Sequence, residues 1–197
     1  MTESQLSRAR FLAYFTVGYN LIEGIVSVAF GTKDESLSLF GFGLDSFIEC
    51  ASALVVLWRL RRESVAESAE SRERLAVRAI GGLFLVLAAV VAAGSILRLA
   101  RTQHPDTALP GIVISLASLS FMVFLYRAKM RLARETGSRT LRSDAVCSLT
   151  CVWLSLVLLA GSALYAMAGI WWADGVAALL IAGLIVREGC EGVSKPA

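Results

Sequence analysis

Histidine is almost absent from this chain, because only one of its 197 residues is a histidine. That residue, His104, lies in the segment RTQHPDTALP, which is typical of a surface loop. The basic segment KMRLARETGSRT also holds no histidine run that would collect metal ions. A metal site within this chain would therefore have to rely mainly on carboxylates and thiols.

The sequence also lacks low-complexity tracts and any linker long enough to separate two domains. It continues for only about ten residues after its last apolar segment, so we expect one domain over residues 1–197 and no soluble domain. No Cys-x-x-Cys pair and no cofactor motif is present. This argues against a thiol oxidoreductase that would use Cys147 and Cys151. We expect neither enzymatic activity nor a bound cofactor.

Apolar residues are abundant, at 56% of the chain with a mean hydropathy of +0.67. Such values are typical of a small integral membrane protein, and a membrane-spanning helix needs about 20 mostly apolar residues. A full-length span follows the starting segment MTESQLSRARF, so we interpret it as the first helix rather than a signal peptide. We predict an all-α polytopic membrane protein with six transmembrane helices, at about 10–31, 37–60, 76–99, 110–128, 143–169 and 171–187.

Basic residues are unevenly distributed between the predicted loops. Of the 19 Lys and Arg residues, all but Lys33, Arg98 and Arg101 fall near the two termini or the loops after the second and fourth spans. The positive-inside rule therefore predicts a cytoplasmic N-terminus and a cytoplasmic C-terminus. The net charge of +3 then reflects topology and lipid anchoring. We expect an integral protein of the cell (inner) membrane that binds no nucleic acid.

Two acidic residues, Asp45 and Glu49, lie inside the second predicted span, LSLFGFGLDSFIECASALVVLWRL. Four residues are about one helical turn, so both carboxylates leave the same face of the helix. A carboxylate at bilayer depth costs on the order of several kcal/mol, and it persists where it lines a polar path or meets a cation. The pair indicates half of a metal site and favours a transport function.

The fifth predicted span, LRSDAVCSLTCVWLSLVLLAG, can supply the other half. Cys147 and Cys151 are four residues apart, Asp144 precedes Cys147 by three residues, and Ser148 lies on the same stripe. A cysteine in an apolar helix is usually a small hydrophobic residue, and one helical turn is a poor geometry for a disulfide. Together with the pair on the second span, however, two thiolates and two carboxylates can surround a zinc-like ion.

The first predicted span contains Glu23, three residues after Asn20 and therefore on the same face. A buried glutamate can be protonated and simply hydrogen-bonded. It can equally carry protons or contact and orient the metal ligands without binding the metal itself. The residues alone leave these interpretations open.

Taken together, these segments resemble the cation diffusion facilitators, which are proton-coupled exporters of divalent metals, and the resemblance covers essentially the entire chain. The run SLSLFGFGLDSFIE is similar to the second-helix motif of the family, with the ligand positions at Asp45 and Glu49. The run TLRSDAVCSLTC is similar to the fifth-helix motif, in which Leu-Arg-x-Asp precedes a His-x-x-x-Asp pair. On that register the metal ligands of the fifth span would be Cys147 and Cys151. The resemblance also implies that Asn20 and Glu23 form the polar, membrane-embedded part of the first helix.

The chain departs from the family pattern in three ways. Cysteines replace the His-x-x-x-Asp pair, a basic loop replaces the histidine-rich loop of many zinc members, and the usual cytoplasmic C-terminal domain is not in this sequence. We therefore expect a short, divergent branch of the family. An alternative register would place Asp144 at a ligand position, with Ser148 one turn further on.

The resemblance implies proton-coupled efflux of a divalent transition metal from the cytoplasm. Two thiolates and two carboxylates favour Zn(II), with Cd(II), Fe(II) and Co(II) as rivals, over Mg(II) or Ca(II). Since the family generally works as a dimer, we also expect a homodimer, with small residues such as Gly82 and Ala89 of the third span at the contact. The competing hypothesis is a non-transporting membrane scaffold or subunit whose buried polar groups only hold helices together.

Overall fold

The computed structural model describes residues 2–33, 36–61, 66–101 and 108–194, so His104 lies outside the described residues. The described residues form six helices and no strand, as the sequence predicts. The bounds of α2 and α5 follow the predicted spans closely, whereas α1 and α3 begin earlier and α4 and α6 end later than expected. The helices are α1 (Glu3–Lys33), α2 (Leu37–Arg61), α3 (Ala66–Ala100), α4 (Leu109–Thr136), α5 (Arg139–Ala168) and α6 (Ala173–Ser194).

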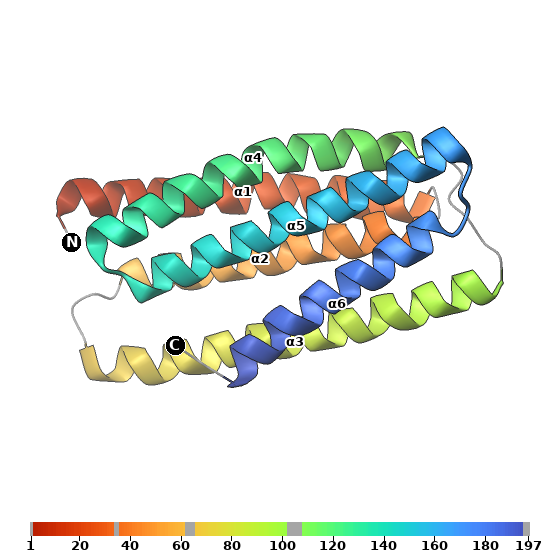
Figure 1. The fold of residues 1–197 in the computed structure, drawn as a ribbon. Coiled ribbons are helices and arrows are strands. Elements are labelled where there is room, and N and C mark those ends of the chain that lie inside the picture. The colour runs from red at the N-terminus through yellow and green to blue at the C-terminus, as the bar shows by residue number, and fades with distance from the viewer. Residues whose placement is uncertain (1, 34–35, 62–65, 102–107, 195–197) are drawn as a thin grey trace.

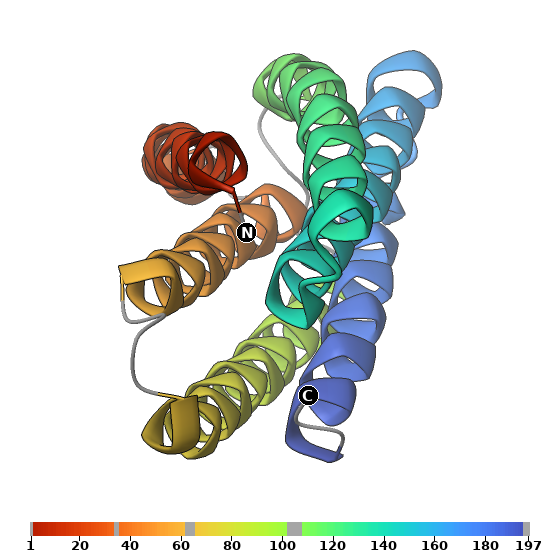
Figure 2. The ribbon, with the colours of Figure 1, turned by 90° about the vertical axis from the view of Figure 1, so that its left-hand side faces the viewer.

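The helices lie side by side in one elongated bundle (Figure 1), with both ends of the chain toward the same end of it. The closest partners are α1 with α2, α4 with α5, and α3 with α6. Viewed along the bundle, α2 and α5 lie between the α1–α4 side and the α3–α6 side (Figure 2). These two inner helices carry the acidic pair and the two cysteines, so the fold places both candidate half-sites in the interior.

The surface of the bundle suits a lipid environment. Four helices of the described residues are long and apolar enough to cross a membrane, namely Glu3–Lys33, Leu37–Trp58, Leu109–Thr136 and Asp144–Ala168, and α3 contributes a shorter apolar stretch at Phe84–Leu97. Large apolar side chains point outward, including Phe11, Ile22 and Val86, each more than 60% exposed. Helices of spanning length with apolar side chains on the outside are those of an integral membrane protein, while the side that faces the cytoplasm remains a prediction.

Two buried apolar clusters hold the bundle together, and α2 and α5 contribute to both. One cluster joins these helices to α3 and α6, around Phe42, Val91 and Leu158. The other joins them to α1 and α4, around Leu12 and Met122. The polar residues of α2 and α5 are therefore held between two packed layers.

Asp174 ties the first turn of α6 to the first turn of α2. Its carboxylate accepts hydrogen bonds from the Ser36 hydroxyl at 2.6 Å, from the Leu37 amide at 3.1 Å and from the Ser38 hydroxyl. A carboxylate is favourable at a helix N-terminus, where amide groups lack partners within the helix. Asp174 is thus a structural clamp between the ends of two helices.

The backbones of α1 and α2 approach closely because glycines line their contact. A Cβ atom added at Gly31 would lie 2.6 Å from the Phe40 amide nitrogen, and one added at Gly43 would lie 2.8 Å from the Val28 amide nitrogen. Small residues allow such close packing of helices in lipid. The contact fixes α2 against α1.

We expect Gly31→Ala to destabilise the protein by about 1–3 kcal/mol, because backbone atoms of α2 would have to move. Gly18→Ala is the matched control in the same helix, since no atom lies within 4 Å of the added Cβ. Thermal unfolding in detergent should show a lower midpoint for Gly31→Ala only. Equal midpoints for both variants would refute the close contact.

Candidate metal centre

The candidate site is formed where α2 and α5 face each other. Asp45 and Glu49 lie one turn apart on α2. Asp144, Ser148 and Cys151 are four and then three residues apart on α5, so they share one face of that helix. All five side chains are at most 4% exposed. The sequence therefore places a polar stripe on each of two helices that the fold brings into contact.

Cys151 is the α5 residue that contacts both acidic residues of α2. Its Sγ atom lies 2.9 Å from Glu49 Oε2 and 3.2 Å from Asp45 Oδ2, both within hydrogen-bond distance. A thiol has a single hydrogen and donates to one oxygen at a time. These three predicted ligands come together from two helices that are distant in sequence.

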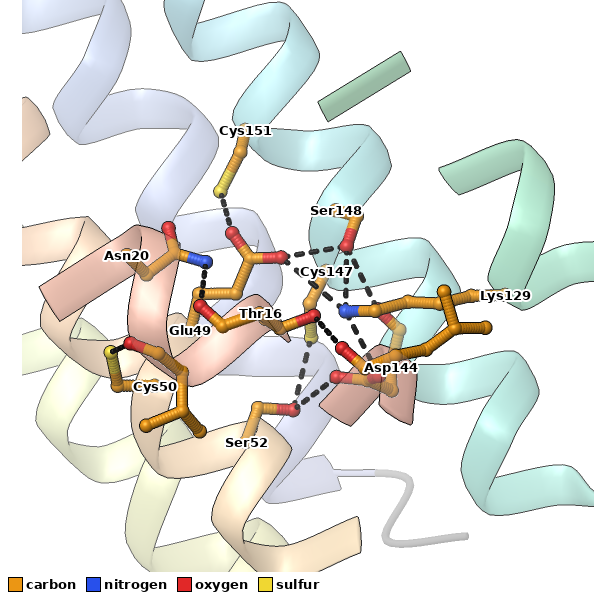
Figure 3. A network of polar contacts seen from close by, with 12 residues as sticks. Thr16, Asn20, Glu49, Cys50, Ser52, Lys129, Asp144, Cys147, Ser148 and Cys151 are labelled. Carbon is orange, nitrogen blue, oxygen red and sulfur yellow. Dashed lines mark hydrogen bonds and ion pairs between the residues drawn. The ribbon is translucent and has the colours of Figure 1, made fainter. Parts of the chain in front are cut away.

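The other oxygen of Glu49 faces a second set of partners. Ser148 donates a hydrogen bond to Glu49 Oε1 at 2.6 Å. The ammonium group of Lys129, on α4, lies 3.6 Å from the same oxygen and 2.9 Å from Asp144 Oδ2, and it donates to Ser148 Oγ at 2.9 Å (Figure 3). Glu49 is therefore shared between a thiol on one side and a buried cation on the other.

Lys129 corrects the sequence-based interpretation of the fourth loop. We expected this lysine to be a topology signal beyond a span ending at residue 128, but α4 continues to Thr136 and the Lys129 side chain is 1% exposed. The two-residue connection between α4 and α5 makes an antiparallel pair, which places residue 129 level with residues 144–148. Lys129 also follows Met122 and Leu125 at helical spacing on the buried face of α4, and this spacing is the signal in the sequence for its burial.

Cys147 lies apart from the Cys151 contacts. A helix turns about 100° per residue, so Cys147 lies about 60° around the axis from Asp144, against about 20° for Cys151. Its Sγ atom accepts a 3.8 Å hydrogen bond from Ser52 Oγ, and Ser52 also lies 3.4 Å from Asp144 Oδ1. Ser52, which is three residues after Glu49, was not among the expected site residues. No disulfide involves Cys147 or Cys151 in the described structure.

The first helix adds Asn20 and Glu23 to the polar interior. Glu23 accepts hydrogen bonds from Tyr19 OH at 2.8 Å and from Ser46 Oγ at 3.0 Å. Asn20 donates to the Thr16 carbonyl at 3.1 Å, whereas its own carbonyl oxygen is buried without a partner in the described part of the chain. Glu23 is thus a hydrogen-bonded buried carboxyl group, and Asn20 offers an unused oxygen.

In this structure the site is closed by its own hydrogen bonds and ion pairs. Within the described ranges, no group of three or more His, Cys, Asp or Glu side chains is already arranged to hold a metal ion. The carboxylate oxygens of Glu49 instead face Cys151, Ser148 and Lys129. A cation could bind to Asp45, Glu49 and Cys151 only after the thiol loses its proton and these contacts rearrange.

Comparison with known proteins identifies the family to which this chain belongs. A family model described as the cation efflux transmembrane domain matches residues 13–195. Transmembrane protein 163 from Xenopus laevis is 26% identical over 187 residues, an alignment that covers 93% of this chain and 66% of that protein. The chain thus spans slightly less than two thirds of the length of this relative. The match to the family model covers nearly the whole chain, and we conclude that this protein belongs to the cation efflux family.

Proposed function

We propose that this chain is a proton-coupled exporter of divalent transition-metal ions in the cell (inner) membrane, with Zn(II) as the favoured cargo. The observation that carries the proposal is the contact of the Cys151 thiol with both the Asp45 and the Glu49 carboxylates. All three side chains are buried in the bundle interior, with Cys151 4% exposed and each carboxylate 2% exposed. Membership of the cation efflux family supports transport of a cation. Cd(II), Fe(II) and Co(II) are the rival cargoes.

The ligand set accounts for the choice of metal. One thiolate with two carboxylates gives a mixed sulfur and oxygen shell, which suits Zn(II) and disfavours Mg(II) or Ca(II). Three protein ligands with a fourth position open to water or Cys147 suit an ion that must enter and leave, because closed four-ligand sites are typical of structural zinc. Asp144 with Ser148 remains the alternative ligand pair on α5.

Proton coupling follows from the same ligands. A thiol and a carboxyl group must both lose their protons to bind a metal ion, so loading the site releases protons and reprotonation favours release of the ion. Access to the site from alternate sides would then let an inward proton gradient drive metal outward. Glu23, with Asn20 beside it on α1, is our candidate for the proton path.

A non-transporting scaffold is the second candidate, and a specific observation favours it. The ion pairs of Lys129 join α4 to Asp144 of α5 and to Glu49 of α2, which is also how interhelical polar contacts stabilise a bundle. A scaffold needs no common point for its polar groups, whereas a metal site needs its ligands within about 2.0–2.3 Å of one ion.

Transport assays in everted vesicles separate the two functions. With an acidic vesicle lumen, we expect vesicles containing the protein to accumulate Zn(II), and dissipation of the pH gradient to stop this accumulation. Cd(II), Fe(II), Co(II) and Mn(II) tested in parallel give the order of preference. Accumulation no greater than in vesicles without the protein would contradict the exporter and favour the scaffold.

We also propose that the protein is a homodimer that pairs through α3. Ala89 is exposed, Gly82 is partly exposed with no atom within 4 Å of an added Cβ, and Val86 and Val90 beside them are 64% and 55% exposed. No helix of the same chain covers this face in the described structure.

Replacing Gly82 and Ala89 by leucine should shift the protein toward monomer in detergent-corrected light scattering, whereas Gly18→Leu on α1 should not. A wild-type protein that is monomeric at micromolar concentration would contradict the dimer.

A further inference from the structure

The side chains that meet between α2, α4 and α5 form a buried polar cluster of Asp45, Glu49, Lys129, Asp144, Ser148 and Cys151. Lys129 is the basic residue among them, and a positive charge is unexpected at a cation site. Its ammonium group is 2.9 Å from Asp144 Oδ2, 2.9 Å from Ser148 Oγ and 3.6 Å from Glu49 Oε1. It donates a hydrogen bond to Ser148 and forms ion pairs with Asp144 and, at a longer distance, with Glu49 (Figure 3). A lysine is rarely this buried unless it is paired, and here one of its partners is a proposed metal ligand.

The position of Lys129 sets up a competition for Glu49. The two oxygens of this carboxylate point to different partners, with Oε2 toward Cys151 and Oε1 toward Ser148 and Lys129. An incoming metal ion would bind the Glu49 carboxylate next to the Cys151 sulfur. The nearby ammonium group would repel this ion, since charges interact strongly where water is excluded. Asp144, which is closer to the ammonium group than Glu49 is, can retain the lysine when Glu49 turns to the metal.

The formal charges agree with this arrangement. Asp45, Glu49 and Asp144 together carry three negative charges, and Lys129 carries one positive charge, so the cluster has a net charge of −2. Loss of the Cys151 thiol proton on metal binding makes this charge −3, and a bound divalent cation then reduces it to −1. Without the lysine, the three carboxylates and the thiolate would carry −4 and would hold a divalent ion more strongly.

We propose that the Lys129 ammonium group competes with the transported ion for the Glu49 carboxylate. This competition weakens the binding of the ion enough for its release. This inference rests on the proposed function, because it assigns Lys129 a role at that same site. Asp144 and Ser148 are positioning residues that hold the lysine next to Glu49. Asp144 thus acts on metal affinity through Lys129 rather than as a ligand.

The test is a double-mutant cycle on the purified full chain, with Cd(II) as the probe and calorimetry as the readout. All proteins carry Cys190→Ser, because Cys190 is exposed and would bind Cd(II) by itself. We expect Lys129→Met to bind Cd(II) at least about tenfold more tightly than wild type, since a repelling charge is lost. Lys33→Met, the same substitution at an exposed lysine, should leave the affinity unchanged.

Asp144→Asn should change the affinity in the opposite direction. Without Asp144 the lysine has Glu49 as its remaining carboxylate partner, so we expect Cd(II) to bind about tenfold more weakly. Adding Lys129→Met to Asp144→Asn should restore tight binding. If Asp144 were instead a metal ligand, the double variant would bind Cd(II) at least about tenfold more weakly than Lys129→Met, and this would overturn the inference.

The double variant also keeps the test decisive if Lys129→Met alone fails to fold, since it leaves no unpaired charge at Asp144. Its affinity is then compared with that of Asp144→Asn, and an equal or weaker value overturns the proposal. Equal Cd(II) affinities for wild type and Lys129→Met would overturn the role of Lys129 while the metal site stands. Absence of Cd(II) binding in every protein would instead contradict the proposed function itself.

Discussion

Replacing Glu49 by glutamine is expected to lower Zn(II) affinity by roughly a hundredfold or more. This exceeds the loss of about 10–100-fold in metal affinity that is typical when a residue that only orients the ligands is replaced. Glu49 is the residue on which the cluster converges, since it contacts Cys151, Ser148 and Lys129. The amide keeps the size of the side chain but removes the negative charge that a cation needs. Lys129 keeps its ion pair with Asp144, so the variant should still fold and insert.

Asp45→Ala and Glu49→Ala should likewise abolish metal binding, because each removes a carboxylate from the only pair at this depth of α2. Glu191→Gln is the matched control, as it removes the charge of an exposed glutamate at the end of α6 whose partner is Arg187. Calorimetry on purified protein, with a thermal melt to verify folding, gives the comparison. Wild-type Zn(II) affinity in either alanine variant would rule out the assignment.

Replacing Cys151 by serine should reduce Cd(II) affinity far more than Mn(II) affinity, because a thiolate selects soft and borderline ions and a hydroxyl does not. The structure adds a distinction that the sequence pattern lacks. Cys151 contacts Asp45 and Glu49, whereas Cys147 contacts Ser52. The loss of Cd(II) affinity should therefore be larger for Cys151→Ser than for Cys147→Ser.

Competition of Cd(II) and Mn(II) with a chromophoric indicator measures these affinities. The double cysteine variant should bind Cd(II) no more strongly than Cys151→Ser does. Cys50→Ser is the control, since this thiol donates its hydrogen bond to the Val17 carbonyl at 3.4 Å. Equal losses of Cd(II) and Mn(II) in Cys151→Ser would mean that the sulfur is not a ligand.

Helical periodicity was sufficient to predict much of this architecture. Apolar runs of membrane-spanning length predicted the helices, and the four-residue spacing of Asp45 and Glu49 predicted that both face one way. The family motif placed Cys151 opposite them. These features depend on local spacing, which a sequence displays directly.

The role of Lys129 required the fold. A lysine in a basic segment after an apolar run is usually a solvated or interfacial residue, and no local pattern shows which helix covers it. Its burial follows from the short connection between α4 and α5, which brings Asp144 and Ser148 level with it. The different surroundings of Cys147 and Cys151 are likewise set by the rotation of α5 against α2, which spacing alone does not determine.

X-ray absorption spectroscopy of the Zn(II)-loaded protein tests the central claim most directly. In a Cys50→Ser, Cys190→Ser background, we predict one zinc ion per chain, with one or two sulfur ligands at about 2.3 Å and oxygen ligands at about 2.0–2.2 Å. Cys151→Ser should remove a sulfur ligand from that shell. A shell of nitrogen and oxygen atoms alone, or no stoichiometric zinc, would contradict a metal centre at Asp45, Glu49 and Cys151.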